Sequence, residues 1–247
     1  MRLRSVWVGL CAALAVSACA ENANHLNTHY LSRFATPEPT LASFTVCHGF
    51  GCAERSHASL TLAQWHKVVA EFRPRAKNAK TERQQIARAV ALTERLVGPQ
   101  TGTDAQQWTH KNMLILPNLG DTTQLDCVDE SVNTWTYMTL MERGGLLHFH
   151  RVADLSNAGG LTDPNMRNTA VLQEKGGGYY AVDASLVGYG KAPLVMSLAT
   201  WMGHWPPDLS ATEQVAKGGG KQQPAHKQIR HRQSAKRAKP PTRPASS

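Results

Sequence analysis

Residues 126–143 constrain the fold more than any other segment, because they form a helical pattern that is apolar on more than one face. The apolar side chains recur at helical spacing but spread around the axis: Val128, Val132, Trp135, Tyr137, Met138 and Met141. Such a helix needs neighbours on several sides. Asp126 stands at its start as an N-cap, and Gly144 and Gly145 follow its end. We therefore predict a central, buried helix that begins beside Cys127.

The segments around this helix predict an α+β fold. Three strand patterns follow it at residues 146–152, 168–174 and 179–186, and the three glycines at 176–178 predict an antiparallel hairpin between the last two. A short strand pattern at 41–46 and amphipathic helices at 61–72 and 81–97 precede it, the second helix capped by Thr81 and stopped at Pro99. A last short helix is expected at 196–205. We expect helices packed on a small antiparallel sheet.

The positive charge of the chain is concentrated at its C-terminus. The 247 residues include 27 Lys and Arg against 18 Asp and Glu, a net charge of +9. Nine of the basic residues and none of the acidic ones lie in 214–247, so residues 1–213 are electrically balanced. Gly, Pro, Gln, Lys and Arg dominate this end, which predicts a disordered basic tail. The remaining core-forming sequence predicts a single globular domain at 41–213.

The N-terminus has the pattern of an export signal. Arg2 and Arg4 precede an apolar run at 6–16, which ends in Val-Ser-Ala-Cys at 16–19. This ending resembles the bacterial lipobox, and it predicts a signal peptide at 1–18, lipidation of Cys19 and a polar linker at 19–40. We therefore expect a lipid-anchored protein of the bacterial cell envelope. Because Ala20, the residue after the cysteine, is not Asp, we expect the anchor at the outer membrane, with the protein facing the periplasm. Ordinary cleavage, with Cys19 an incidental thiol, is the alternative.

Three cysteines remain after processing. Cys47 and Cys52 enclose two glycines, and the oxidising envelope favours a disulfide between them. A metal knuckle with His48 is the competing interpretation, but one Cys-x4-Cys pair without a second ligand pair is weak evidence for zinc. Cys127 is left unpaired, either as an inert buried thiol or as a reactive group.

Cys127 and Asp183 carry a resemblance to a known superfamily. A helix N-terminus favours a thiolate at Cys127, and Asp183 lies on a late strand. Over residues 124–186, this order resembles the transglutaminase-like and papain-like cysteine hydrolase core. Residues 126–133, 168–172 and 180–183 are also similar to uncharacterised bacterial envelope proteins. The resemblance implies a nucleophilic Cys127, a histidine base on a strand, and Asp183 orienting that base.

The chain departs from this superfamily at the base. The histidine should stand at the start of the second strand, where residues 166–169 read Met-Arg-Asn-Thr. Arg167 stays protonated near neutral pH and is no base. Either His148 or His150, which share one face of the preceding strand, reaches Cys127, or the fold is a degenerate hydrolase used for binding. We favour the second interpretation.

Simpler roles stay open for each of these residues. Cys127 then fills space in the core, Asp183 caps a hairpin, and His148 and His150 flank a strand at the surface. A His-x-His metal pair would need a third ligand such as Asp129 or Glu130, which no spacing fixes. We therefore predict no metal and no cofactor.

Two function classes remain. The first is a cysteine hydrolase or acyl transferase acting through Cys127 on peptide or amide bonds of the envelope. The second, which we favour, is a binding or structural lipoprotein whose basic tail contacts peptidoglycan carboxylates, anionic lipid or an acidic protein, unless the tail only aids solubility. Nucleic acid is excluded as a physiological partner, because the chain is exported and its tail has no interleaved aromatic residues.

Overall fold

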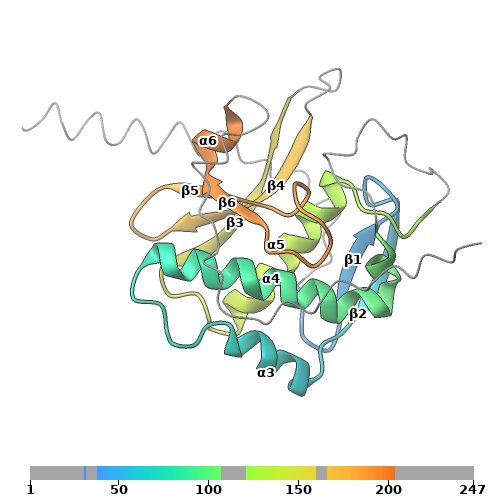
Figure 1. Cartoon of the computed structure of the whole chain (residues 1–247), viewed down its shortest axis with the longest axis horizontal. Coiled ribbons are helices and arrows are strands. Elements are labelled where there is room, and N and C mark those ends of the chain that lie inside the picture. The colour runs from blue at the N-terminus through green and yellow to red at the C-terminus, as the bar shows by residue number, and fades with distance from the viewer. Residues whose placement is uncertain (1–30, 32–37, 107–120, 160–165, 204–247) are drawn as a thin grey trace, which may run out of the picture. The chain divides into compact units, whose positions relative to one another are not determined.

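In the computed structural model of the chain, the structure describes residues 31, 38–106, 121–159 and 166–203 (Figure 1). These residues form a mixed α+β fold with four helices and two antiparallel sheets, which confirms the predicted class. The elements in chain order are β1 (Phe44–His48), β2 (Glu54–Ala58), α3 (Leu62–Ala70), α4 (Ala79–Thr101), the 3-10 helix η1 (Thr103–Ala105), α5 (Cys127–Arg143), β3 (His150–Ala158), β4 (Arg167–Glu174), β5 (Tyr179–Asp183), β6 (Leu194–Ser197) and α6 (Leu198–Met202).

Several predicted segments lie outside the described residues. They include the signal peptide at 1–18, Cys19 and the basic tail at 214–247. The chain divides into two units, 1–216 and 217–247, and every described residue belongs to the first. None of the helices that the structure describes combines the length and the apolar composition that crossing a bilayer requires.

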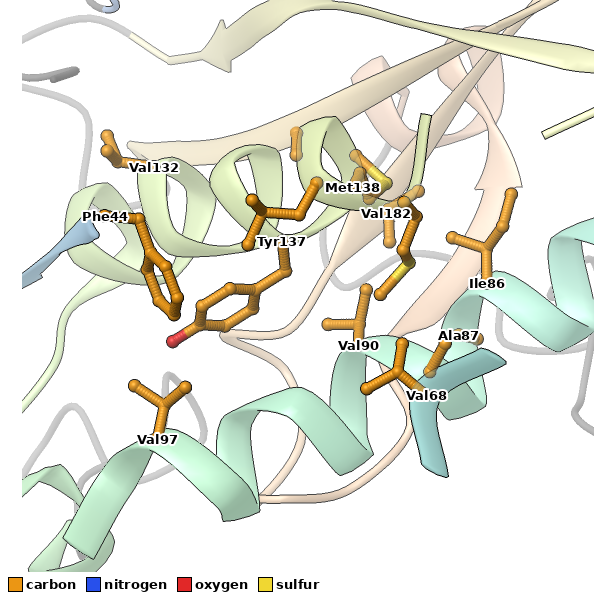
Figure 2. Close-up of a cluster of buried hydrophobic side chains, with 14 of the residues drawn as sticks. Phe44, Val68, Ile86, Ala87, Val90, Val97, Val132, Tyr137, Met138 and Val182 are labelled. Carbon is orange, nitrogen blue, oxygen red and sulfur yellow. The ribbon is translucent and has the colours of Figure 1, made fainter. Parts of the chain in front are cut away.

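Helix α5 is the centre of the fold, as its sequence predicted. All but three of its 17 residues are buried. Figure 2 shows the side chains that pack between α5 and α4, with Tyr137 edge-on to Phe44 of β1 at a ring-centroid distance of 6.2 Å. Val90 and Val97 of α4 lie in the same core and are at most 1% exposed. Each such side chain contributes about 1.5–3 kcal/mol by leaving water.

The larger sheet has the order β3-β4-β5-β6, with every neighbouring pair antiparallel. The predicted hairpin between β4 and β5 is confirmed. Successive residues of β4 face opposite sides: Ala170 and Leu172 join the core under α5, and Val171 joins a second cluster with Trp201 of α6. The sheet is therefore covered by α5 on one face and by α6 on the other.

The smaller sheet pairs β1 with β2 and carries the predicted disulfide. Cys47 of β1 is bonded to Cys52 in the turn between the strands, which confirms that prediction. Asn133 of α5 fastens this ribbon, because its side chain accepts a hydrogen bond from the Cys47 N–H (2.7 Å) and donates one to the Cys47 carbonyl (2.8 Å). The disulfide loop thus lies directly against the N-terminal half of α5.

The predicted limits of α4 were wrong at both ends. Asn78, not Thr81, is the N-cap, and its side chain accepts the Thr81 N–H at 2.9 Å. The helix also continues through Pro99, although proline removes one helical hydrogen bond. Two tertiary bonds support this last turn, since the Gln100 side chain accepts the Ser59 N–H (3.1 Å) and donates to the Ser59 carbonyl (3.0 Å).

The strand predicted at 146–152 instead begins at His150 and runs to Ala158. The N–H groups of His148 and Phe149 donate to the carboxylate of Glu82 at 2.7 and 2.9 Å. Those groups are therefore unavailable to a neighbouring strand, and the ladder with β4 starts only at His150.

Two further strands were missed or assigned to another element. β2 is polar and mostly exposed, so it has none of the apolar alternation that marks a strand in sequence. β6 occupies the start of the helix predicted at 196–205, because its residues pair with β5. The helix that follows, α6, is only five residues long in the described part.

Candidate functional site

The N-terminus of α5 is built from two carboxylates and the disulfide loop. The Asp126 side chain accepts the N–H groups of Val128 (2.9 Å) and Asp129 (3.0 Å), which confirms it as the N-cap. The Asp129 carboxylate accepts the N–H of Asp126 (3.0 Å) and also those of Cys52 (2.7 Å) and Phe50 (3.0 Å). These bonds join the helix start and the loop into one unit, and they fix the backbone that carries Cys127.

Cys127 is a buried, neutral thiol. Only 7% of the residue is exposed, and burial, with a smaller contribution from the charge of Asp126, raises the pKa of the thiol to about 12. We expected the helix N-terminus to favour a thiolate, but the loss of hydration outweighs that attraction here. The sulfur is therefore protonated near neutral pH.

Asn168 faces this thiol, and it lies in the stretch 166–169 where we expected a histidine. Its side-chain amide donates to the Cys127 sulfur across 3.5 Å. An amide nitrogen cannot take up a proton near neutral pH, so Asn168 cannot act as the base. Its Oδ1 is buried and has no hydrogen-bond partner among the described residues. The sequence showed that the expected histidine is absent, but it did not predict the contact between Asn168 and Cys127.

Asp183 lies on the other face of the sheet. Asp183 shares its face of β5 with Tyr179 and Ala181, and the Ala181 side chain packs in the cluster under α6. Its carboxylate accepts the Trp201 indole N–H (2.7 Å) and the Ser185 hydroxyl (2.7 Å). Asn168, which contacts Cys127, and Asp183, the predicted orienting acid, thus lie on opposite faces of the sheet, and no described hydrogen bond connects them.

His150 belongs to a different buried network. Its Nδ1 lies 2.9 Å from the carboxylate of Glu82, and its Nε2 lies 3.0 Å from the guanidinium of Arg83. Because a guanidinium can only donate, Nε2 accepts and the ring proton resides on Nδ1. Arg83 also pairs with Glu174 at 2.7 Å and stacks over the Tyr180 ring at 3.6 Å. Both nitrogens of His150 are therefore engaged.

Neither candidate histidine is brought to Cys127. His150 is paired with Glu174, and Asn168 lies six residues before Glu174 on β4. At a strand rise of about 3.3 Å per residue, His150 is about 20 Å along the sheet from the residue that contacts the thiol. His148 lies beyond His150, exposed at the surface. Of the four predicted site residues, the structure therefore gathers none into one catalytic group.

A second pair of acidic residues is buried between α4 and α5. Glu94 and Glu130 are 5% and 3% exposed. Burial raises the pKa of both carboxyls, and at Glu130 the neighbouring Glu94 raises it further. Glu94 accepts the Gly190 N–H at 2.6 Å, and Gln106 donates to Glu130 at 3.3 Å. The surroundings of both acids therefore favour the protonated carboxyl, because two adjacent buried charges would repel each other.

The described residues contain one group with the spacing of metal ligands, namely Cys47, Cys52 and Asp129 within 4.8 Å. The two sulfurs are joined as a disulfide and offer no thiolate. His48, the predicted third ligand of a knuckle, instead has Nδ1 2.6 Å from the Thr122 carbonyl and Nε2 2.9 Å from the Ser56 hydroxyl. Cys47, Cys52 and Asp129 thus hold the loop against α5 through the disulfide and the Asp129 hydrogen bonds.

Comparisons of the chain with protein-family models, with curated proteins and with solved structures found no match.

Proposed function

We propose that this protein is a lipid-anchored protein of the bacterial cell envelope, with a degenerate transglutaminase-like fold that binds rather than hydrolyses. The observation that carries the proposal is the contact between Cys127 and Asn168, an amide in place of a base. The order of elements supports the fold, since Cys127 begins the central helix and antiparallel strands with Asn168 and Asp183 follow. The raised pKa of Cys127 supports the loss of hydrolysis.

The alternative is an active cysteine hydrolase or acyl transferase. Such an enzyme needs a base within hydrogen-bond reach of the thiol, about 2.6–3.2 Å or one water away. Asn168 cannot serve, and His150 is held by Glu82 and Arg83 at the other end of the sheet. The described residues therefore favour binding over catalysis.

The reactivity of Cys127 tests this proposal. We would alkylate the full chain with iodoacetamide at neutral and mildly alkaline pH and follow the Cys127 peptide by mass spectrometry. We expect slower alkylation than that of free cysteine, because the buried thiol is protonated. Asn168→His should accelerate the reaction by supplying a base, and Asn168→Gln should not. Wild-type alkylation faster than free cysteine at neutral pH would establish the alternative instead.

The two ends of the chain support the localisation in this proposal. The lipobox-like residues 16–19 place Cys19 where a lipid would be attached, and multiple acyl chains anchor a protein stably. Residues 214–247 carry nine cations and no acidic residue, which suits contact with anionic envelope polymers such as peptidoglycan. The domain would then be held at the membrane by one end and at an anionic surface by the other.

Fractionation tests each end separately. Cys19→Ser should move the protein from the membrane fraction to the soluble fraction, because it removes the site of lipidation. Deletion of 214–247 should abolish salt-sensitive retention on isolated cell wall, and so should a tail of the same length with every Lys and Arg changed to Gln. Unchanged retention in the neutral-tail variant would show that the tail charges do not make the contact.

A further inference from the structure

A pocket of the described residues lies away from Cys127, where the end of α3, the segment after it and the approach to β3 meet. It encloses about 360 Å³. Val69, Phe72 and Leu146 give it an apolar lining, and Arg73, Arg75 and His148 contribute cationic or ionisable side chains. An apolar hollow with a few convergent polar groups is the usual form of a small-molecule site.

The walls of this pocket are fastened to α4. Gln85 of α4, which is only 3% exposed and lines the pocket, donates its side-chain amide to the Pro74 carbonyl at 2.7 Å. On the other wall, the His148 N–H donates to Glu82 of α4 at 2.7 Å, and the His148 carbonyl accepts the Lys175 ammonium at 2.9 Å. The backbones that carry the cationic side chains are therefore positioned before any ligand arrives, which lowers the entropic cost of binding.

None of the described residues neutralises the positive charge of the pocket. Arg73 and Arg75 are exposed, and neither forms an ion pair with any residue in the described ranges. Glu71, which adjoins the pocket in sequence, pairs with Arg88 at 3.0 Å. Glu82 is occupied by His150 and by backbone N–H groups. The pocket lining includes no acidic residue, so the local field favours an anion.

We propose that this pocket binds a small amphipathic anion, with the apolar part of the ligand on Val69, Phe72 and Leu146 and its carboxylate or phosphate against Arg73 and Arg75. A guanidinium matches both of these anions in a two-pronged geometry. The pocket is large enough for a bicyclic aromatic group or a short acyl chain and too small for a folded partner. This inference does not rest on the role of Cys127, because the pocket and the thiol share no residue.

Calorimetric titration of the full chain with four probes separates the two halves of this chemistry. 1-Naphthyl phosphate and 1-naphthoate carry both an apolar ring and an anion, 1-naphthol carries the ring alone, and inorganic phosphate carries the charge alone. We expect at least one of the two complete ligands to bind about tenfold or more tightly than both partial ones. Binding of phosphate alone at equal affinity would overturn the apolar part of the proposal, and equal binding of naphthol would overturn the anionic part.

Two variants place the ligand in this pocket. The double substitution Arg73→Gln and Arg75→Gln should weaken the complete ligands by about tenfold or more, because it removes the exposed guanidinium groups. Ala76→Leu should weaken them as well, since it fills the pocket without changing its charge. Arg143→Gln is the control for the loss of an arginine elsewhere, because Arg143 lines a separate pocket of about 260 Å³.

The outcome is readable even if one variant folds poorly. Ala76 is buried, and thermal unfolding would reveal a damaged Ala76→Leu protein. The two exposed arginines have no such structural role, so their variant remains interpretable. Unchanged affinity in the arginine variant, or an equal loss in Arg143→Gln, would overturn the assignment of the ligand to this pocket.

Discussion

Two buried polar assemblies lie at opposite ends of β3 and β4, and they differ in how completely their members are partnered. At one end, the Glu82 carboxylate accepts hydrogen bonds from the His150 ring and from three backbone N–H groups. Arg83 continues this network to Glu174. At the other end, the Asn168 side-chain amide donates to the Cys127 sulfur across 3.5 Å, and the Asn168 side-chain oxygen has no hydrogen-bond partner among the described residues.

The two assemblies keep a thiol and a carboxylate-bound histidine far apart. The molecule has a thiol at a helix N-terminus and a histidine bound to a carboxylate, yet about 20 Å of sheet lies between them. The free nitrogen that a base would need is also taken, since Nε2 of His150 accepts from Arg83. The complete assembly therefore serves structure, and the incomplete one is where polar groups remain unsatisfied.

Removing Glu82 should give the largest loss of stability. Glu82 is fully buried, and Glu82→Ala leaves three backbone N–H groups and the His150 ring without their acceptor. We expect a loss of about 3–5 kcal/mol in the free energy of unfolding. Urea unfolding followed by circular dichroism would measure it.

Glu71→Ala is the matched control for that substitution. Glu71 also pairs with a basic residue, in this case Arg88 at 3.0 Å, but about a third of each side chain is exposed. We expect it to cost under about 1 kcal/mol. Similar losses for Glu71→Ala and Glu82→Ala would contradict the view that the Glu82 assembly is a structural centre.

The Glu94 and Glu130 pair extends the comparison to pH, because each of these acids has another acid as its neighbour. Burial raises the pKa of Glu94 from 4.5 to about 7, so the folded protein holds more protons than the unfolded chain between these pH values. The free energy of unfolding should therefore fall as pH rises through this window, by up to about 3 kcal/mol.

Glu82 should behave in the opposite way. Burial acts to raise its pKa, but the hydrogen bonds from His150 and from the His148 and Phe149 N–H groups prevail and lower it. Its contribution is present above its unfolded pKa and is lost as pH falls through the folded one. Urea unfolding of the wild type and of Glu94→Gln at several pH values would separate the contributions of Glu94 and Glu82. Only the loss of stability that occurs as pH rises above about 4.5 should be smaller in the variant. An identical slope in both proteins would refute the assignment to Glu94.

Local signals made part of this fold predictable. Helix α5 was found because its apolar residues surround the axis and Asp126 caps it, and both features lie within one segment. The disulfide was found because Cys47 and Cys52 are five residues apart with glycines between them. The class followed from the order of such segments, which needs no knowledge of contacts.

The candidate site depended on long-range contacts that no local pattern encodes. Glu82 and His150 are 68 residues apart, and neither carries a signal that it will meet the other. The face of Asp183 depends on the register of β5, because a strand shows which residues alternate but not which side meets the thiol. Asn168 carries no sequence signal of a site residue, because an amide at the start of a strand is neither a base nor a nucleophile. Its role follows solely from its position beside Cys127.

The incomplete assembly should tolerate an apolar substitution, which is the smallest effect we expect. Asn168→Leu removes an amide whose oxygen is unpaired and whose nitrogen donates to a weak acceptor, the Cys127 sulfur. We expect a change within about 1 kcal/mol, since a buried polar group without good partners contributes little. Asn133→Leu is the matched control, because Asn133 is equally buried but exchanges two bonds with the Cys47 backbone at 2.7 and 2.8 Å. That control should cost about 2–4 kcal/mol by leaving the Cys47 N–H and carbonyl unpaired. Equal losses in the two variants would mean that Asn168 is as firmly partnered as Asn133, and the contrast between the two ends of the sheet would fail.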